Sequence, residues 1–112
     1  MKIEFNELPN NNFTYMGITS DVVKSIIVDD IPVGIVYLSD VMDEGIYMEY
    51  IEFLSVFTSK KLLRPVMKAL FDEYGKVYFE SGDELIKKYV AIGSVKGERD
   101  EDREMTSFVY AA

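Results

Sequence analysis

Two carboxylates stand inside an otherwise apolar stretch of the sequence. Glu49 and Glu52 are the only charged residues from position 46 to position 57, where the other side chains suit a β-strand. A carboxylate among apolar side chains has a raised pKa and can take a proton from an amine, directly or through water. Either residue is therefore a candidate general base. The alternative is a carboxylate that lies at the margin of the strand or pairs with a cation.

Four of the twelve basic residues gather just after this stretch. They are Lys60, Lys61, Arg64 and Lys68, and no acidic residue lies between positions 58 and 71, although the chain carries a net charge of −8. Such a cluster indicates a site for an anion, for instance the phosphates of a nucleotide. The alternative is the solvated face of an amphipathic helix.

The composition of the 112 residues excludes several kinds of chemistry. The chain has neither Cys nor His, which removes thiol catalysis, Ser-His-Asp triads, haem ligation, disulfides and zinc sites of the Cys/His type, so we expect no metal. Its acidic charge argues against nucleic acid as a partner. We expect no membrane span and no signal peptide, because no apolar run is long enough, and a cytoplasmic location.

The elements that must position these residues form one domain over residues 1–112, with a short N-terminal part at 1–22 and a core at 23–110. The central strand at 46–57 is expected to be covered on both faces, with Glu49 and Glu52 on opposite faces unless a β-bulge changes the parity. Pro65 places the start of the next helix near Leu62 to Arg64, which leaves a loop at 58–61. The expected C-terminal cap of this helix is Gly75, and its expected apolar face consists of Leu63, Val66, Met67, Leu70 and Tyr74. The other expected strands are 2–8, 25–28, 33–38, 76–80 and 105–110, with a four-residue turn at 29–32.

A second helix is expected after the strand at 76–80. Ser81 and Glu84 form a capping-box pattern, Gly93 ends the helix, and the apolar face carries Leu85, Ile86, Tyr89 and Val90. The charged run at 98–104 is expected to be a solvated hairpin tip, with a docking site for a partner as the alternative. The order β, ββ, β, α, β, α, β predicts an α+β fold with a mixed sheet.

Two short motifs within this order resemble those of the GNAT acyltransferase superfamily. Asp29-Asp30-Ile31-Pro32-Val33-Gly34 is similar to the D-x-x-P-V-G hairpin of that family, and Tyr89-Val90-Ala91-Ile92-Gly93 is similar to its Tyr-x-x-x-Gly. The resemblance covers about residues 22–110. It implies a mostly antiparallel central sheet flanked by helices, with an N-terminal region shorter than is usual in the family.

The resemblance also implies a ligand, acetyl-CoA, and roles for particular residues. Tyr89 would protonate the departing thiolate, and its alternative role is that of a core residue. Backbone amides near Leu54, Val56 and Phe57 would hold the pantetheine. The phosphates would lie on a loop at 58–64, whose remaining candidate residues are Ser59, Lys60, Lys61, Leu62, Leu63 and Arg64.

The expected phosphate loop differs from the family pattern because it contains no glycine. Leu62 and Arg64 stand at the two positions where the family has small residues, and a Cβ there narrows the approach of the backbone to a phosphate. The sequence therefore supports two functions. One is acetyl transfer from acetyl-CoA to an amine. The other is a non-catalytic interaction protein of the same fold, of a kind carried by bacteriophages, that binds a protein partner. With either function, the chain could form a homodimer.

Overall fold

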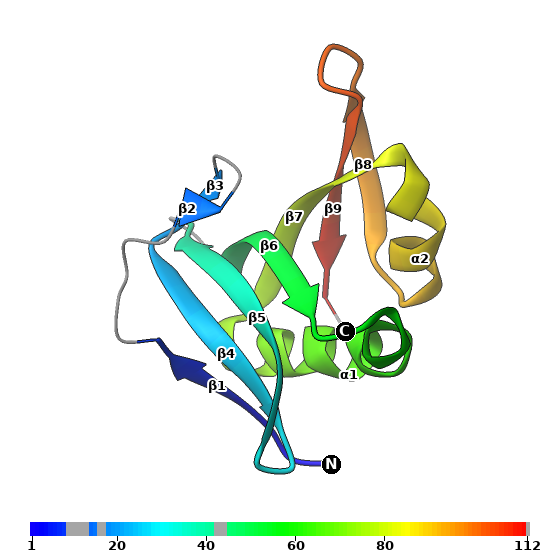
Figure 1. Ribbon diagram of the computed structural model, residues 1–112. Helices are drawn as coiled ribbons and strands as arrows, with labels where there is room; N and C mark the ends of the chain where they lie inside the picture. Colours follow the sequence, from blue (N-terminus) through cyan, green and yellow to red (C-terminus); the bar gives the residue numbers. More distant parts are fainter. Residues whose placement is uncertain (9–13, 16–17, 42–44, 112) are drawn as a thin grey trace.

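The computed structural model describes residues 1–8, 14–15, 18–41 and 45–111, and its main feature is a seven-stranded sheet (Figure 1). The strand order is β1-β4-β5-β6-β7-β9-β8, and within it only β6 and β7 run parallel. This confirms a mostly antiparallel α+β fold. The strands are β1 Ile3–Glu7, β4 Val22–Val28, β5 Ile31–Asp40, β6 Gly45–Phe53, β7 Lys76–Gly82, β8 Val95–Asp100 and β9 Met105–Tyr110, and a separate pair is formed by β2 Thr14–Tyr15 and β3 Ile18–Thr19.

The hairpin between β4 and β5 has a tighter turn than the sequence predicted. Asp29 and Asp30 alone form the turn, with φ angles of 49° and 69°, which is the left-handed geometry of a two-residue hairpin loop. Pro32 lies inside β5, next to a bulge in the pairing with β4. The four-residue turn was therefore wrong, since a proline at a bulge can remain within a strand.

β6 is the fourth of the seven strands, as expected for the central one, but it ends at Phe53 and contains a bulge. Tyr37 pairs with Tyr50 and Leu38 with Met48, so Glu49 is the extra residue. The bulge changes the parity, because Ile51 and Phe53 pack on the same core as the buried Ile46 and Met48.

Helix α1, Val56–Tyr74, begins earlier than expected and includes Pro65. The Ser55 hydroxyl caps it by accepting a hydrogen bond from the Thr58 amide at 3.1 Å. Its apolar side chains pack on the sheet, which outweighs the cost of about 3 kcal/mol for an internal proline. The expected start at 62–64 and the loop at 58–61 were wrong, whereas the Gly75 cap and the apolar face were confirmed, the buried residues being Leu63, Val66, Met67 and Leu70.

The second helical segment consists of η1, Asp83–Leu85, followed by α2, Ile86–Ala91. No capping box forms, because Ser81 belongs to β7 and its hydroxyl donates to the Gly82 carbonyl at 3.0 Å. Leu85 and Val90 are exposed, so of the expected apolar face only Tyr89 is buried and Ile86 half-buried. The charged run divides between strand β8, which was not expected, and the turn at 101–104.

The remaining expectations fall partly outside the described residues. Part of the N-terminal segment at 1–22 lies there, as does the middle of the connection between β5 and β6. Among the described residues, no helix has the length and apolar character that a membrane span requires.

Candidate active site

The parallel strands β6 and β7 pair over only three residues before they separate. The pairs are Gly45 with Lys76, Ile46 with Val77, and Tyr47 with Tyr78. Two cavities, of about 250 and 220 Å³, lie beyond this point. We call the space between the diverging strands the wedge. Figure 1 shows β6 leading into α1 and β7 leading toward α2, so both helices flank the wedge.

Tyr89 lines both cavities of the wedge. Its ring packs against Phe79 at 4.6 Å and Phe108 at 5.8 Å between centroids, so β7, β9 and α2 together hold it. Burial raises the pKa of the Tyr89 hydroxyl. A phenol with a raised pKa keeps its proton at neutral pH, so this hydroxyl has a proton that it can donate. The residue is both part of the core and part of the cavity wall.

The two candidate bases come to different cavities. Glu49 lines the 250 Å³ cavity together with Tyr89. Glu52 lines the 220 Å³ cavity with Tyr89 and also a groove of about 430 Å³ beside β4 and β5. Both glutamates are exposed. Each carboxylate thus lines a cavity that Tyr89 also lines. The bulge in β6 positions Glu49, and the end of β6 positions Glu52.

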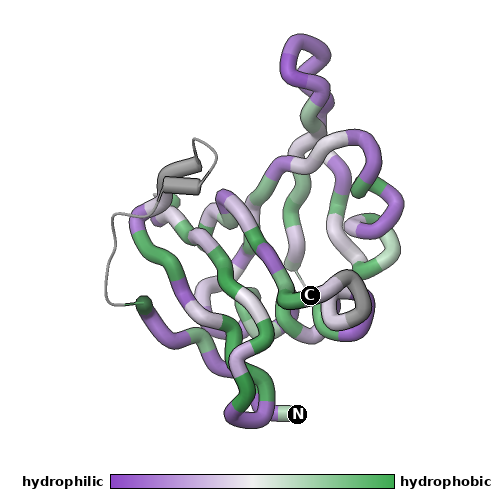
Figure 2. The backbone as a smooth tube through the Cα atoms, viewed as in Figure 1, coloured by the Kyte–Doolittle hydropathy of each residue, from purple (hydrophilic) through white to green (hydrophobic). Residues whose placement is uncertain are grey.

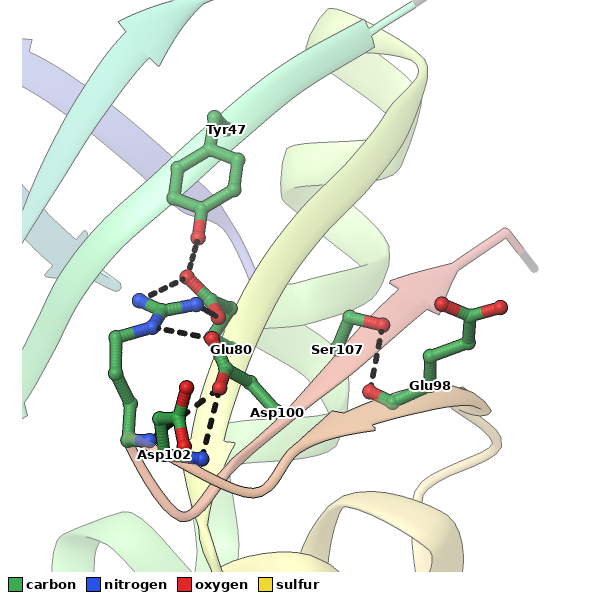
Figure 3. Close-up of polar contacts among 7 residues, drawn as sticks. Tyr47, Glu80, Glu98, Asp100, Asp102 and Ser107 are labelled. Atoms are coloured by element: carbon green, nitrogen blue, oxygen red, sulfur yellow. Dashed lines mark hydrogen bonds and ion pairs between the residues drawn. The ribbon is translucent and has the colours of Figure 1, made fainter.

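A third carboxylate, Glu80 of β7, lines the 250 Å³ cavity from the opposite side. The Tyr47 hydroxyl donates to Glu80 Oε1 at 3.0 Å, and the Arg103 guanidinium donates to both carboxylate oxygens (Figure 3). Burial and this hydrogen bond raise the pKa of Tyr47. Arg103 also donates to Asp100 within the β8–β9 hairpin at 2.8 Å, so its pair with Glu80 joins this hairpin to the wall of the wedge. Sequence reasoning did not single out Glu80.

The first turn of α1 borders the 220 Å³ cavity. Ser55, Ser59 and Leu63 line it, and Lys88 reaches it from α2. Lys88 Nζ donates to the Ser59 hydroxyl at 2.6 Å, which places a positive charge beside the helix N-terminus. Lys88 was not among the predicted residues. The local sequence offered no signal for it, because its partner is 29 residues away.

The structure corrects the predicted phosphate loop. Residues 58–64 lie within α1, and the Ser59 amide already bonds to the Ser55 carbonyl at 3.0 Å. Arg64 Nη2 donates to the Ala91 carbonyl of α2 at 2.7 Å. Lys60 and Lys61 are exposed on the helix surface, and Leu62 is half-buried. Leu62 and Arg64 therefore lie beyond the first turn, where their Cβ atoms do not restrict the helix N-terminus.

The three residues predicted to contact pantetheine lie between the end of β6 and the first turn of α1. Leu54 is 77% exposed, and its amide donates to the Val33 carbonyl at 3.0 Å, so this amide is already bonded within the sheet. Val56 and Phe57 are the first two residues of α1 rather than part of the strand. The pairing of β6 with β7 ends at Tyr47. Beyond this residue, the backbone groups on the edge of β6 that faces the wedge are not paired with β7.

Comparison with known proteins supports the fold. No family model matches the sequence, and no curated protein does. A protein assigned as a GNAT-family acetyltransferase from Bacteroides thetaiotaomicron superposes with a TM-score of 0.64 at 17% identity, over 81% of this chain and 61% of that one. The spermidine/spermine N-acetyltransferase SpeG of Vibrio cholerae gives a TM-score of 0.61 at 11% identity, over 98% and 95%.

A third similar structure contains acetyl coenzyme A. It is a protein from Bacillus anthracis str. Ames assigned as a streptothricin acetyltransferase, with a TM-score of 0.55 at 13% identity, over 81% of this chain and 63% of that one. This chain spans less than two thirds of the Bacteroides and Bacillus proteins. The fold of the chain is that of the GNAT acetyltransferases, as the hairpin and the Tyr-x-x-x-Gly motif predicted.

Proposed function

We propose that the protein is an N-acetyltransferase that moves an acetyl group from acetyl-CoA to an amine. The observation that carries the proposal is the wedge, in which a buried tyrosine lines two cavities and a carboxylate lines each of them. A proton donor and a proton acceptor on facing walls are what the attack of an amine on a thioester needs. The GNAT fold supports the same reaction by analogy.

The residues present fit the chemical groups of acetyl-CoA. The unpaired edge of β6 after Tyr47 can hydrogen-bond to the amides of an extended pantetheine, as a sheet edge binds an added strand. The first turn of α1, together with Ser59 and Lys88, suits a pyrophosphate, because helix N-termini and cations favour anions. Lys60, on the exposed side of the same turn, adds a second cation.

Acetyl-CoA supplies the activated acetyl thioester, and the chain supplies the proton transfers. Glu49 takes the proton that the amine loses as it attacks, with Glu52 as the other candidate. Tyr89 donates its hydroxyl proton to the thiolate sulfur as the carbon–sulfur bond breaks. Because burial raises the pKa of Tyr89, this proton remains on the hydroxyl at neutral pH until the sulfur becomes basic.

Titration with acetyl-CoA, followed by thermal unfolding, tests the proposal. A ligand that binds only the folded state at 100 times its dissociation constant stabilises it by about 2.7 kcal/mol. Lys88→Met should weaken binding, whereas Lys87→Met, a matched loss of charge on the exposed side of α2, should bind as the parent does. Release of free thiol with a panel of amines then measures turnover. An absence of any thermal shift at millimolar acetyl-CoA would contradict the proposal.

One observation favours the non-catalytic alternative. Ile31 and Leu54 are 62% and 77% exposed, and Leu54 borders the 430 Å³ groove beside β4 and β5. Exposed apolar side chains beside a groove are typical of a surface that binds another protein. A bacteriophage protein with a structural or host-modulating role would need this surface and not the wedge. It would show no thermal shift with acetyl-CoA, so the same titration separates the two functions.

A further inference from the structure

The short helix that carries Tyr89 has little stability of its own. α2 has six residues, and its N-cap residue Leu85 makes no side-chain capping bond. Helices of this length do not persist in water without tertiary contacts. The position of Tyr89 therefore depends on what ties α2 to the rest of the molecule.

Three polar contacts tie this helical segment to its neighbours. At its start, the Arg99 guanidinium donates to the Asp83 carboxylate at 2.8 and 3.2 Å. Along its length, Lys88 donates to Ser59 of α1. At its end, Arg64 of α1 donates to the Ala91 carbonyl at 2.7 Å. Lys88 and Ala91 lie on either side of Tyr89, so two contacts with α1 bracket this residue.

The carbonyl groups at the end of α2 show why Arg64 matters. The Tyr89 carbonyl accepts from the Ser94 amide at 3.1 Å, and the Val90 carbonyl accepts from the Gly93 amide at 3.0 Å. The next carbonyl, that of Ala91, accepts from Arg64. The donors to the first two carbonyls are therefore backbone amides just after α2, whereas the donor to the Ala91 carbonyl is a side chain of another helix. The positive charge of Arg64 also complements the negative end of α2.

We propose that Arg64 is a positioning residue, which acts through the Ala91 carbonyl to hold α2 on α1 and so sets the position of the Tyr89 hydroxyl in the wedge. The effect on turnover rests on the proposed function, whereas the effect on the geometry of Tyr89 does not. The sequence had assigned Arg64 to phosphate binding, and its contact with α2 gives it a different role. A change in this side chain should alter the chemical step more than the binding of acetyl-CoA.

The experiment compares Arg64→Met with Arg64→Lys, which keeps a donor, and with Lys87→Met as the matched control. Arg64 and Lys87 are both exposed, so all three variants should fold. Loss of a charge-assisted hydrogen bond should raise hydrogen exchange at the Ser94 amide about tenfold or more. Arg64→Met should also shift the NMR signal of a ¹³C-labelled Tyr89 ring, assigned with Tyr89→Phe. Arg64→Lys should restore most of both signals, and Lys87→Met should leave them as in the parent.

Kinetics separate positioning from ligand binding. Arg64→Met should lower kcat about 10-fold to 100-fold, the range for a misplaced reacting group, with the KM for acetyl-CoA within about twofold of the parent. A raised KM with unchanged kcat would overturn the proposal in favour of phosphate binding. An unchanged Tyr89 signal in Arg64→Met would overturn it as well. If acetyl-CoA does not bind the parent, the proposed function fails, while the exchange and NMR measurements still decide the role of Arg64.

Discussion

The two halves of the sheet are held together by different interactions. In the half formed by β1, β4, β5, β6 and α1, aliphatic side chains with almost no exposed surface form the core, among them Ile26, Leu38 and Leu70. In the half formed by β7, β9, β8 and α2, the rings of Phe79 and Phe108 stack at 5.3 Å with Tyr89 beside them. This half also carries the arginine–carboxylate pairs of Arg99 and Arg103, and Figure 2 shows the β8–β9 tip as hydrophilic.

This difference explains where the candidate site lies. The first half contributes a long helix and the open edge of β6, both held by a dense aliphatic core. The second half contributes Tyr89 on a short helix, which is held by ring packing on Phe79 and Phe108 and by a few polar contacts. The wedge is the boundary between them, because only three residue pairs join β6 to β7. We therefore expect the wall formed by the second half to adjust more readily to a ligand than the wall formed by the first half.

The largest effect is expected from the hydroxyl of Tyr89. Tyr89→Phe keeps the ring and should lower turnover by about 10²–10⁴-fold, the range for loss of general acid–base catalysis. Stability should change by no more than about 1.5 kcal/mol. Tyr89→Ala should instead destabilise the second half by about 3–5 kcal/mol through a cavity. Steady-state kinetics and denaturant unfolding measure the two effects, and full activity in the Phe variant would limit Tyr89 to packing.

The next largest effect is expected on the free energy of unfolding when a side chain in the aliphatic core of the first half is truncated. Leu70 has no exposed surface, so Leu70→Ala should lower the free energy of unfolding by about 2–5 kcal/mol. Leu54→Ala is the matched control, because Leu54 lies in the same half at 77% exposure, and it should change stability by about 0.5 kcal/mol at most. Equal losses in urea unfolding would mean that Leu54 is covered in solution.

The three-residue pairing between β6 and β7, which connects the two halves, depends on Gly45. A Cβ at this position would lie 2.0 Å from the Lys76 carbonyl oxygen, so β6 and β7 would have to move apart. Gly45→Ala should therefore cost about 1–3 kcal/mol, as other overpacked sites do. At Gly82 the nearest atom to such a Cβ is Glu84 Oε1 at 3.8 Å, so Gly82→Ala should unfold at nearly the parent's temperature. The idea of a tight join fails if both variants melt alike.

The smallest effect is expected on the loss of stability at low pH. Hydrogen bonds from Arg99 hold the pKa of Asp83 below its usual range, and Arg103 does the same for Asp100. A pKa depressed in the folded state gives stability that is present above about pH 4 and is lost as the pH falls through the folded value. The double variant Asp83→Asn/Asp100→Asn should therefore lose less of its Tm than the parent between about pH 5 and pH 2.

The control for this comparison lies in the other half. Asp72→Asn, on the exposed side of α1, removes a carboxylate without touching the arginine pairs and should follow the pH profile of the parent. If Asp72→Asn flattens the profile as much as the double variant does, acid sensitivity comes from overall charge. The arginine pairs would then contribute nothing particular to the second half.

The parts of the fold that could be predicted from sequence are those with strong local signals. Strand β9 has the expected bounds, and α1 has the expected apolar face and glycine cap. The start of α1 could not be predicted, because burial of Leu63 and the cap at Ser55 outweigh the local penalty of Pro65. Strand β8 has no apolar periodicity, since it is exposed along most of its length and depends on pairing with β9.

The same distinction applies to the candidate site. Tyr89 could be found because a motif marks it, and Glu49 because a charge in an apolar strand is conspicuous. Glu80 and Lys88 could not, since their partners Arg103 and Ser59 are 23 and 29 residues away. The contact of Arg64 could not be found for the same reason, because nothing in a basic cluster indicates that one of its cations donates to a carbonyl on another helix.

The parallel pairing of β6 with β7 also has a consequence for the order of folding. β4, β5 and β6 are neighbours in sequence as well as in the sheet, so their contacts close short loops, whereas β6 meets β7 only after the 19-residue α1 has crossed between them. Contacts between distant segments form slowly because chain entropy must be lost first. We therefore expect the β4–β6 meander to form early and the wedge to assemble last, so that the region proposed to bind acetyl-CoA is also the one that opens at least cost in the folded protein.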